Sequence, residues 1–427
     1  MRTTVHCLAT TLALVLPLAA CGDGAMGATG GHADDDAAPS AADGAGADGV
    51  VAADTPSADP RADAGPGDAG PASPKANPTL LGIAENTALD LGKYRCDQPA
   101  DNPGGCNAIT DYGRFNYDPV AHQLLMFGGG HAGAYGNEVE RFDFATLQWS
   151  ATYKATLCAD QTPANFDPDT ASWKDNGAPL ARHVWDMMTI ADVAGRRSLV
   201  ILTSGGLGAE TCNPGPAQTF PPLQTRTMWF DIEAKKWTFG RTMPDKHWYY
   251  ATAGETDPVS GKQVVFGDDG VKLYDPAADS VTDLAFDPAS KFDRGHIGYS
   301  NNLVYYPPTD RFYYFARGEA TLVFELVLDR ARSSVTVSEL TTTGAGPTDE
   351  TGWAYDSKNK VIGGGIRAGV FSAFDPATRS WDRPTMKVAS DGGVPDSVVF
   401  HALDYDPVDD VYVFLNTEKR TWAYRYR

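Results

Sequence analysis

A short motif recurs five times along the chain, and it constrains the fold more than any other feature. An aromatic or aliphatic residue precedes an aspartate, and a large apolar residue follows six positions after that aspartate. Three of the four intervals between these aspartates are close to the about 40 to 50 residues of one four-stranded propeller blade. One such sheet alone cannot bury both faces, whereas sheets arranged radially cover one another, so the repeat predicts an all-β propeller. The copies are Phe142-Asp143 with Trp149, Phe230-Asp231 with Trp237, Tyr274-Asp275 with Val281, Leu328-Asp329 with Val335, and Phe374-Asp375 with Trp381.

The first copy shows the complete unit. An apolar strand, 124–127, runs into the glycines 128–130, and a second strand ends at Phe142-Asp143. This unit resembles a Kelch repeat, and the resemblance covers about residues 80–427. It implies a Kelch-like propeller and says almost nothing about chemistry. Glycine pairs or triplets at 205–206 and 363–365 keep the pattern, whereas 267–270 and 316–318 depart from it and weaken the expectation of tight turns there.

The strand pattern predicts six blades. The last blade has strands at 398–406, 411–415 and 422–426, and then the chain stops one strand short. We expect residues 85–91 to supply the missing outer strand, which would close the ring and cover two free edges. Seven blades are the alternative, because Phe166-Asp167 followed by Trp173 also fits the motif. Too few residues precede that copy for three more strands, so we interpret 152–179 as a long loop.

The N-terminus has the pattern of an export signal. Residues 1–20 contain an early Arg2 and an apolar run that is too short to span a bilayer. Leu18-Ala19-Ala20-Cys21 resembles the lipobox of bacterial lipoproteins, which implies cleavage before Cys21 and acylation of its thiol. An ordinary secretory signal is the alternative. We expect an exported protein held by its lipid at the outer membrane or surface of a Gram-negative bacterium, although the inner membrane stays open.

A composition change separates the anchor from the repeats. Residues 22–78 contain no Phe, Trp or Tyr and ten aspartates against Arg61 and Lys75. Such a segment cannot bury enough apolar surface to offset its ordering entropy, so we predict a disordered tether. The predicted domains are therefore a signal peptide at 1–20, a lipidated linker at 21–78 and a propeller at 79–427. The formal net charge of −20 argues against nucleic acid as a partner, and we expect a monomer.

Four of the six cysteines would belong to the exported domain, where disulfides persist. Cys7 lies in the signal peptide, and Cys21 would carry the lipid. Three pairings of the remaining four are open. We favour Cys96 with Cys106 and Cys158 with Cys212, because the first pair encloses a local loop and the second would link two long loops of the second blade.

Histidines next to cations recur before three consecutive inner strands. Loops that lead into the inner strands, and those that join the middle strands, open on one face of a propeller, where binding sites are usually built. Such a cluster could bind an acidic sugar or peptide, hold one divalent metal, or abstract a proton. The competing interpretation is that these polar positions only hold backbone together. The candidates are Arg182, His183, Lys246, His247, Trp248, Tyr249, Arg294 and His296, with His131, Tyr135 and Asn137 from the loop after Gly130.

No nucleophile elbow, P-loop or dinucleotide motif is present in the sequence. We therefore favour binding of a glycan or protein ligand on the channel face. A polysaccharide lyase or hydrolase that uses a His/Tyr or metal site on the same face is the alternative, and a structural envelope protein is the third class. The sequence does not decide whether the protein is an enzyme.

Overall fold

The computed structural model describes residues 74–94, 101, 113–128, 135–202, 212, 226–242, 253–267, 270–290, 301–316, 321–348, 352–389, 393–396 and 398–427. Contacts separate the chain at Asp68, and every described residue belongs to the second, compact unit Ala69–Arg427. No described helix is long and apolar enough to cross a membrane.

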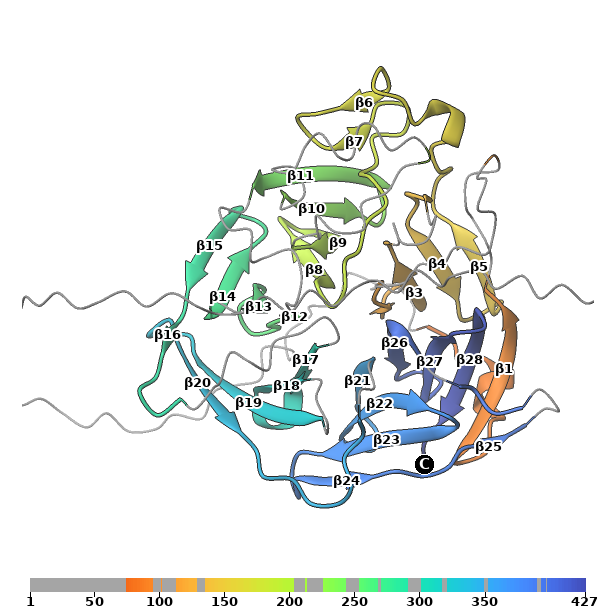
Figure 1. Ribbon diagram of the computed structural model, residues 1–427, viewed down its shortest axis with the longest axis vertical. Coiled ribbons are helices and arrows are strands. Elements are labelled where there is room, and N and C mark those ends of the chain that lie inside the picture. Colours follow the sequence, from red (N-terminus) through yellow and green to blue (C-terminus); the bar gives the residue numbers. More distant parts are fainter. Residues whose placement is uncertain are drawn as a thin grey trace, which may run out of the picture. The chain divides into compact units, whose positions relative to one another are not determined.

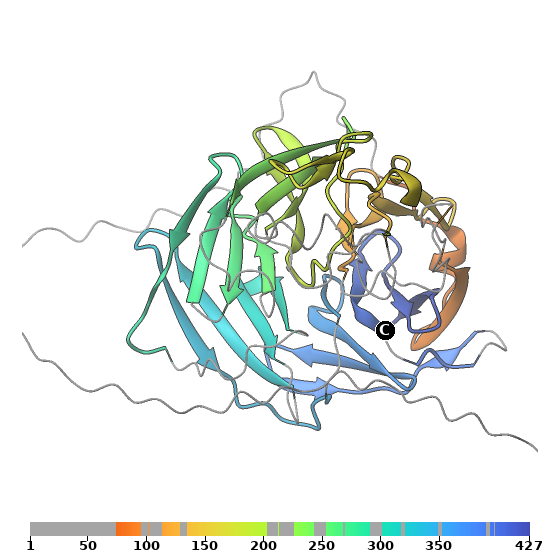
Figure 2. The ribbon, with the colours of Figure 1, turned by 45° about the horizontal axis from the view of Figure 1, so that its top comes forward.

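Six sheets of four or five strands surround one axis in the second unit, as Figures 1 and 2 show. The expectation of an all-β, six-bladed propeller is therefore confirmed. The first three blades are antiparallel sheets in which successive strands run outward from the axis. Blade 1 contains β2 (Asn116–Asp118), β3 (Gln123–Met126), β4 (Glu140–Asp143) and β5 (Gln148–Ala151); blade 2 contains β8 (Met188–Val193), β9 (Arg196–Ile201), β10 (Arg226–Asp231) and β11 (Lys236–Thr242); blade 3 contains β12 (Ala253–Thr256), β13 (Gln263–Gly267), β14 (Gly270–Asp275) and β15 (Ser280–Asp283).

Two of the remaining three blades gain a fifth strand at their outer edge, which pairs in parallel. Blade 4 contains β17 (Asn302–Tyr306), β18 (Arg311–Ala316), β19 (Leu322–Asp329) and β20 (Ser334–Glu339), with β16 (Ala285–Phe286) added; blade 5 contains β21 (Trp353–Asp356), β22 (Val361–Arg367), β23 (Val370–Asp375) and β24 (Ser380–Asp382); blade 6 contains β26 (Val398–Asp406), β27 (Val411–Asn416), β28 (Arg420–Arg425) and β1 (Thr87–Lys93), with β25 (Lys387–Val388) added.

The recurring motif forms the outer hairpin of a blade. The residue before the aspartate pairs across the hairpin with the apolar residue that follows six positions after the aspartate, as in Phe142 with Trp149 and Phe374 with Trp381. The aspartate accepts backbone N–H groups of the intervening turn, as Asp231 does from Ala234 at 2.8 Å. The fourth residue after the aspartate adopts a positive φ, 54° at Lys235. A side-chain cap and a left-handed residue close a tight turn, so the motif is a local hairpin signal.

The ring closes through the N-terminal strand, as expected from the sequence. β1 pairs antiparallel with β28, with Thr87 opposite Arg425 and Lys93 opposite Arg420. Arg420 Nε also donates to Asp90 Oδ2 at 2.6 Å. The short helix α1 (Pro78–Leu81) precedes β1 and contributes the fully buried Leu80 to the core. First and last strands of the unit therefore share one sheet.

Each boundary between neighbouring blades contains its own apolar cluster, and together they form the core. Between blades 5 and 6, Phe371 packs against Tyr412, with ring centroids 4.8 Å apart. A Cβ atom at Gly363 would lie 2.3 Å from the Tyr412 hydroxyl, so this glycine allows the two sheets to approach. The glycine triplet of the sequence motif thus reflects packing between blades as well as turn geometry.

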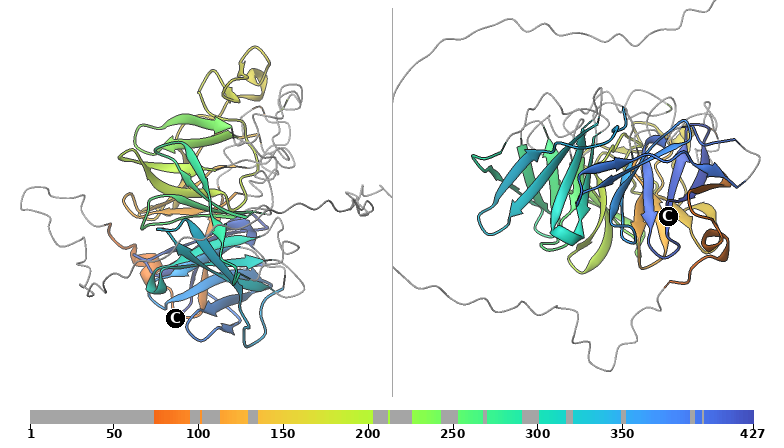
Figure 3. Two further views of the ribbon diagram at one scale, coloured as in Figure 1. Left: turned by 90° about the vertical axis from the view of Figure 1, so that its left-hand side faces the viewer. Right: turned by 90° about the horizontal axis from the view of Figure 1, so that it is seen from below.

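The seven-blade alternative is wrong. The extra copy of the motif forms only a two-strand hairpin, β6 (Phe166–Asp167) with β7 (Ser172–Trp173), outside blade 2 (Figures 1 and 3). Phe166 and Trp173 make the same cross-strand contact as in the blades, but within the described part of the chain no further strand joins them. The predicted Cys158–Cys212 disulfide is present, with its Cα atoms 5.3 Å apart. It links the long loop 152–179 to Cys212. Cys96 and Cys106 lie outside the described residues.

Candidate functional site

A cavity of about 350 Å³ lies in the central channel. It is lined by residues of all six inner strands and by turns that follow them, such as Pro258 and Pro307. Figure 1 shows β8, β12, β17, β21 and β26 around the axis. The lining residues are Arg114, Asn116, Tyr117, Ile190, Glu255, Thr256, Pro258, Val304, Tyr305, Pro307, Trp353, Ala354, Tyr355, Ser357, Asp404, Tyr405 and Pro407.

Four tyrosines and Trp353 are among the residues that line this cavity. Tyr117, Tyr305 and Tyr355 are half-buried and come from three different blades. Tyr355 is held from behind by Tyr306, whose ring lies edge-on with centroids 5.2 Å apart. Aromatic side chains with a polar tip suit a ligand that is apolar on one face and hydroxylated at its edge.

Arg114 is the cation of the cavity and joins three blades. It is nearly buried, and its Nη2 donates to Glu255 Oε2 at 2.6 Å. Its Nη1 donates to the carbonyl oxygen of Gly254 at 2.7 Å and lies 3.3 Å from Asp186 Oδ1. The guanidinium is planar and carries several donors, so it can hold these acceptors from blades 2 and 3 at once. Arg114 is therefore fixed within the channel wall.

Two carboxyl groups near Arg114 have raised pKa values, which favours their neutral forms. Burial raises the pKa of Asp186 to about 7, although the Arg114 charge opposes this shift. Burial likewise raises the pKa of Asp404 to about 6, against the charge of Arg114 and backbone N–H groups. Those amides belong to Tyr117, which donates to Asp404 Oδ2 at 2.7 Å, and to Tyr405. Asp404 thus links blades 1 and 6 while it faces the cavity.

A hydrogen-bonded chain of buried side chains lies behind the cavity wall. Asn302 Nδ2 donates to Asp186 Oδ1 at 2.7 Å and lies 2.9 Å from His401 Nδ1. Asn302 Oδ1 accepts the Gly352 N–H at 3.1 Å, and Asp186 Oδ2 accepts the Leu303 N–H at 2.7 Å. Four blades therefore share one polar network, which satisfies their buried groups and holds the channel in one arrangement.

Four of the eleven ligand-binding candidates from the sequence lie among the described residues, and none of these four lines the cavity. Arg182 is buried and donates to the carbonyl oxygens of Leu180 and Ala171, and burial lowers its pKa to about 10. The His183 ring lies edge-on to Trp185 at 5.3 Å. These contacts hold both side chains in place, and a role of Arg182 and His183 in ligand binding stays a prediction.

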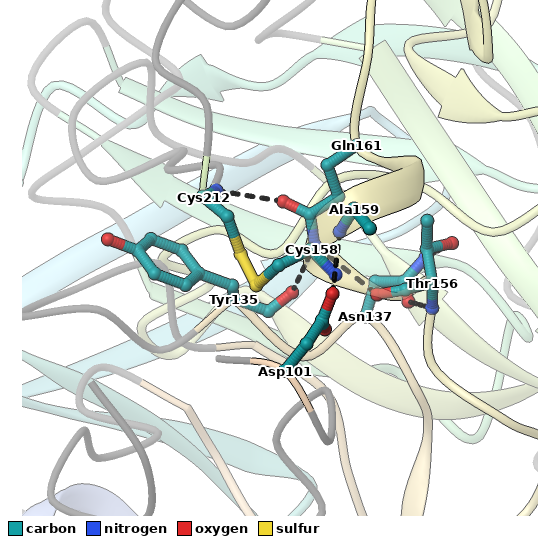
Figure 4. The surroundings of a disulfide bond; sticks show 8 residues. All are labelled: Asp101, Tyr135, Asn137, Thr156, Cys158, Ala159, Gln161 and Cys212. Atoms are coloured by element: carbon teal, nitrogen blue, oxygen red, sulfur yellow. Dashed lines mark hydrogen bonds between the residues drawn. A yellow bond between two sulfur atoms is a disulfide. The ribbon is translucent and has the colours of Figure 1, made fainter. Parts of the chain in front are cut away.

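The other two described candidates support the long loop of blade 2. Asn137 Oδ1 accepts the Thr156 N–H at 2.9 Å, and the Tyr135 carbonyl oxygen accepts Gln161 Nε2 at 3.3 Å. Figure 4 shows both residues around the Cys158–Cys212 disulfide. The remaining candidates lie outside the described residues, so the proposed histidine cluster stays a prediction: His131, Lys246, His247, Trp248, Tyr249, Arg294 and His296.

Sequence reasoning missed the residues of the cavity, although a signal for them exists. The inner strand ends in Tyr-Asp in blades 1, 5 and 6, at Tyr117-Asp118, Tyr355-Asp356 and Tyr405-Asp406. Each of these tyrosines lines the channel. A tyrosine at one register of several inner strands could therefore have indicated an aromatic channel.

Comparison with known proteins leaves the family of this chain open. No family model matches the chain, and no curated protein matches it. Solved structures that resemble it include a structural genomics protein of unknown function from Bacteroides thetaiotaomicron, at 10% identity and a TM-score of 0.44, over 80% of this chain and 75% of that one. A gluconolactonase from Xanthomonas campestris matches at 8% identity and a TM-score of 0.44, over 79% of this chain and 88% of that one. Likenesses of this strength do not identify a ligand or a reaction.

Proposed function

We propose that the protein is an exported, lipid-anchored glycan-binding protein whose channel cavity holds a sugar unit. The observation that carries this proposal is one cavity of about 350 Å³ that is lined by three half-buried tyrosines together with Arg114, Glu255 and Asp404. Ligand pockets span about 300 to 1,000 Å³, so this one suits a small unit and not the face of a folded protein.

The chemistry of the lining matches a pyranose ring. Tyrosine faces can cover the C–H face of a sugar, while carboxylate and guanidinium groups accept and donate hydrogen bonds at its hydroxyl edge. Glu255 Oε1 accepts the Thr256 N–H at 2.7 Å, and its Oε2 is held by Arg114, so the carboxylate is oriented before a ligand arrives. A preorganised site loses less entropy on binding.

The charges of the cavity select among sugars. Its ionisable carboxyl groups are Glu255 and Asp404, and its guanidinium is that of Arg114, already paired with Glu255. A uronate would bring a further negative charge beside these carboxyl groups, and like charges disfavour each other in a partly buried site. We therefore expect a neutral or amine-bearing sugar in this cavity.

Binding can be tested on an array of neutral, amino and acidic glycans with the mature protein, followed by calorimetry with the best hit. Y355A should weaken that binding by about tenfold, because it removes an aromatic wall. F286A is the matched control, since Phe286 is an exposed aromatic residue that does not line the cavity. Equal affinity for wild type, Y355A and F286A would place the ligand elsewhere and overturn the proposal.

Hydrolysis of a glycan is the second candidate, favoured by the presence of two carboxyl groups in one cavity. Glycoside hydrolases use such a pair, with different environments for the two groups. Here Glu255 is paired with Arg114, whereas Asp404 is held by backbone amides. Incubation of the best array ligand with wild type, E255Q and D404N distinguishes the cases: turnover that both variants lose supports an enzyme, and binding without turnover supports the first proposal.

A further inference from the structure

Three potential metal ligands meet at the boundary between blades 6 and 1, apart from the cavity. His122 lies in the turn between β2 and β3, Asp406 is the last residue of β26, and Asp409 lies in the turn between β26 and β27. All three are buried, and their side-chain ligand atoms lie within 4.8 Å of one another. His122 Nε2 is 3.0 Å from Asp406 Oδ2 and 3.5 Å from Asp409 Oδ2. None of the three lines the channel cavity.

Backbone amides orient both carboxyl groups toward one point. Asp406 Oδ1 accepts the Val408 N–H at 2.9 Å, and Asp409 Oδ1 accepts the Asn77 N–H at 2.6 Å. The second oxygen of each group is thereby directed at His122. Asp409 is fully buried, and its Oδ2 accepts no hydrogen bond from the described residues. A buried carboxylate oxygen without a donor is costly, so this atom points to a missing partner.

At two other blade boundaries, an arginine of the next blade lies beside the buried aspartate that follows or ends the inner strand. The turn aspartate of blade 3, Asp257, binds Arg330 of blade 4 through two hydrogen bonds of 2.8 Å. Asp118 of blade 1 lies 3.4 Å from Arg197 of blade 2. The boundary between blades 6 and 1 instead has an imidazole and a second acid.

Arg425, which contacts the backbone of Asp409, does not pair with its carboxylate. Arg425 donates to the carbonyl oxygen of Asp409 at 2.9 Å and pairs with the carboxylate of Asp410. Its guanidinium also donates to carbonyl oxygens of Leu80 and Ile83. Two buried carboxyl groups therefore face one imidazole, and a buried charge needs a compensating partner.

We propose that His122 Nε2, Asp406 Oδ2 and Asp409 Oδ2 bind one divalent transition-metal ion, of which Zn²⁺ is the best match. Zn²⁺ takes imidazole nitrogen and carboxylate oxygen at about 2.0 to 2.2 Å in tetrahedral geometry, so its ligand atoms stand about 3.3 Å apart. The separations of 3.0 and 3.5 Å fit such an edge. Ca²⁺ and Mg²⁺ prefer oxygen ligands alone, so the imidazole disfavours them. Water would complete the coordination.

The ion would stabilise the closure of the ring. It would bind a turn of blade 1 to a turn of blade 6, and through Asp409 it would be connected to Asn77, which precedes helix α1. Asn77 Nδ2 in turn donates to the Phe144 carbonyl oxygen at 2.6 Å. Metal binding to the folded state alone stabilises that state, so the ion should raise the melting temperature.

The test uses the full mature chain, stripped with EDTA, desalted and titrated with Zn²⁺ or Co²⁺. One equivalent of Zn²⁺ should raise the melting temperature by at least about 3 °C. Co²⁺ should give the intense visible bands of a tetrahedral site. D409N should abolish both effects and still fold, because it removes a buried negative charge. D310N is the matched control, since Asp310 also sits in a blade turn but is hydrogen-bonded to Arg330 and Tyr305, and it should respond like the wild type.

A second variant covers the case in which D409N does not fold. H122Q removes the nitrogen ligand, and it should lose the Co²⁺ bands and the response to Zn²⁺. The proposal is overturned if the wild type shows neither effect, or if H122Q and D409N respond as the wild type does, because the ion then binds at another site of the chain.

Discussion

At the scale of single residues, Arg330 shows how one side chain joins two blades. Its guanidinium forms paired hydrogen bonds with Asp257 of blade 3 and with Asp310 of its own blade, at 2.7 to 2.8 Å. Asp257 is fully buried. Burial raises the pKa of Asp257, but hydrogen bonds and charge from Arg330 outweigh it and leave that pKa below its usual value. The Arg330 hydrogen bonds likewise lower the pKa of Asp310.

We predict that R330M destabilises the propeller by about 3 to 5 kcal/mol at pH 7, because it leaves a buried carboxylate without its partner. Lowered aspartate pKa values stabilise the fold above the unfolded value of about 4, and this contribution is lost as pH falls through the lower folded values. The difference between wild type and R330M should therefore shrink toward pH 3. Urea unfolding at pH 7 and pH 3 measures both quantities.

R332M is the control for this experiment. The Arg332 side chain is 84% exposed and lies 3.7 Å from Asp329, so its loss should cost under about 0.5 kcal/mol. A constant gap between wild type and R330M across this pH range would show that Arg330 acts by packing and not by charge.

Residue roles were the hardest part to predict from sequence. The adjacent Arg182 and His183 are predicted ligand groups that do not line the cavity, and Arg182 donates to carbonyl oxygens of Leu180 and Ala171. In contrast, Arg114 and Glu255 carry no local signal, because they lie far apart in sequence and meet only when the blades close. Which side of an inner strand faces the channel also depends on the twist of each sheet, which a single sequence does not show.

At the scale of elements, prediction succeeded where the signal is local. The recurring motif is one hairpin with its own turn cap and cross-strand pair, so each copy identifies the outer two strands of a blade. The fifth strands β16 and β25 were not predicted. They are two residues long and pair in parallel with distant segments, and such short strands have no periodicity to recognise.

We predict that deletion of residues 79–95 destabilises the entire ring and does not merely fray one end. The deletion removes β1, exposes the edge of β28 and takes away Leu80, Ile83 and Ala88, which are buried. Burial of one large apolar side chain stabilises a fold by about 1.5 to 3 kcal/mol, so the stability lost with this segment is comparable with the total stability of a domain. Calorimetry should show a lower melting temperature for the single main transition.

Removal of residues 22–68 is the matched deletion, because these residues precede the compact unit Ala69–Arg427. This shorter chain should melt like the wild type. An unaltered melting curve for the 79–95 deletion would mean that β1 contributes nothing to closure.

At the scale of the whole molecule, we predict that Cys21 attaches the protein to a membrane. In C21S the thiol needed for acylation is missing, and a propeller without its lipid should leave the membrane fraction. Detergent phase partitioning of whole cells measures the shift. C7S is the control, because Cys7 precedes the expected cleavage site and should not matter. Partitioning of C21S into the detergent phase would contradict the lipoprotein assignment.

Because β1 and β28 pair in one sheet, the closed ring does not depend on which blade comes first in the sequence. Asn86 N donates to the Tyr426 carbonyl oxygen at 3.3 Å, so the start and the end of the ring are hydrogen-bonded neighbours. A short loop could join them, and new ends could then be opened between any two other blades. Such a circular permutant would place the proposed lipid anchor next to another blade, and it would change the direction in which the channel faces relative to that anchor.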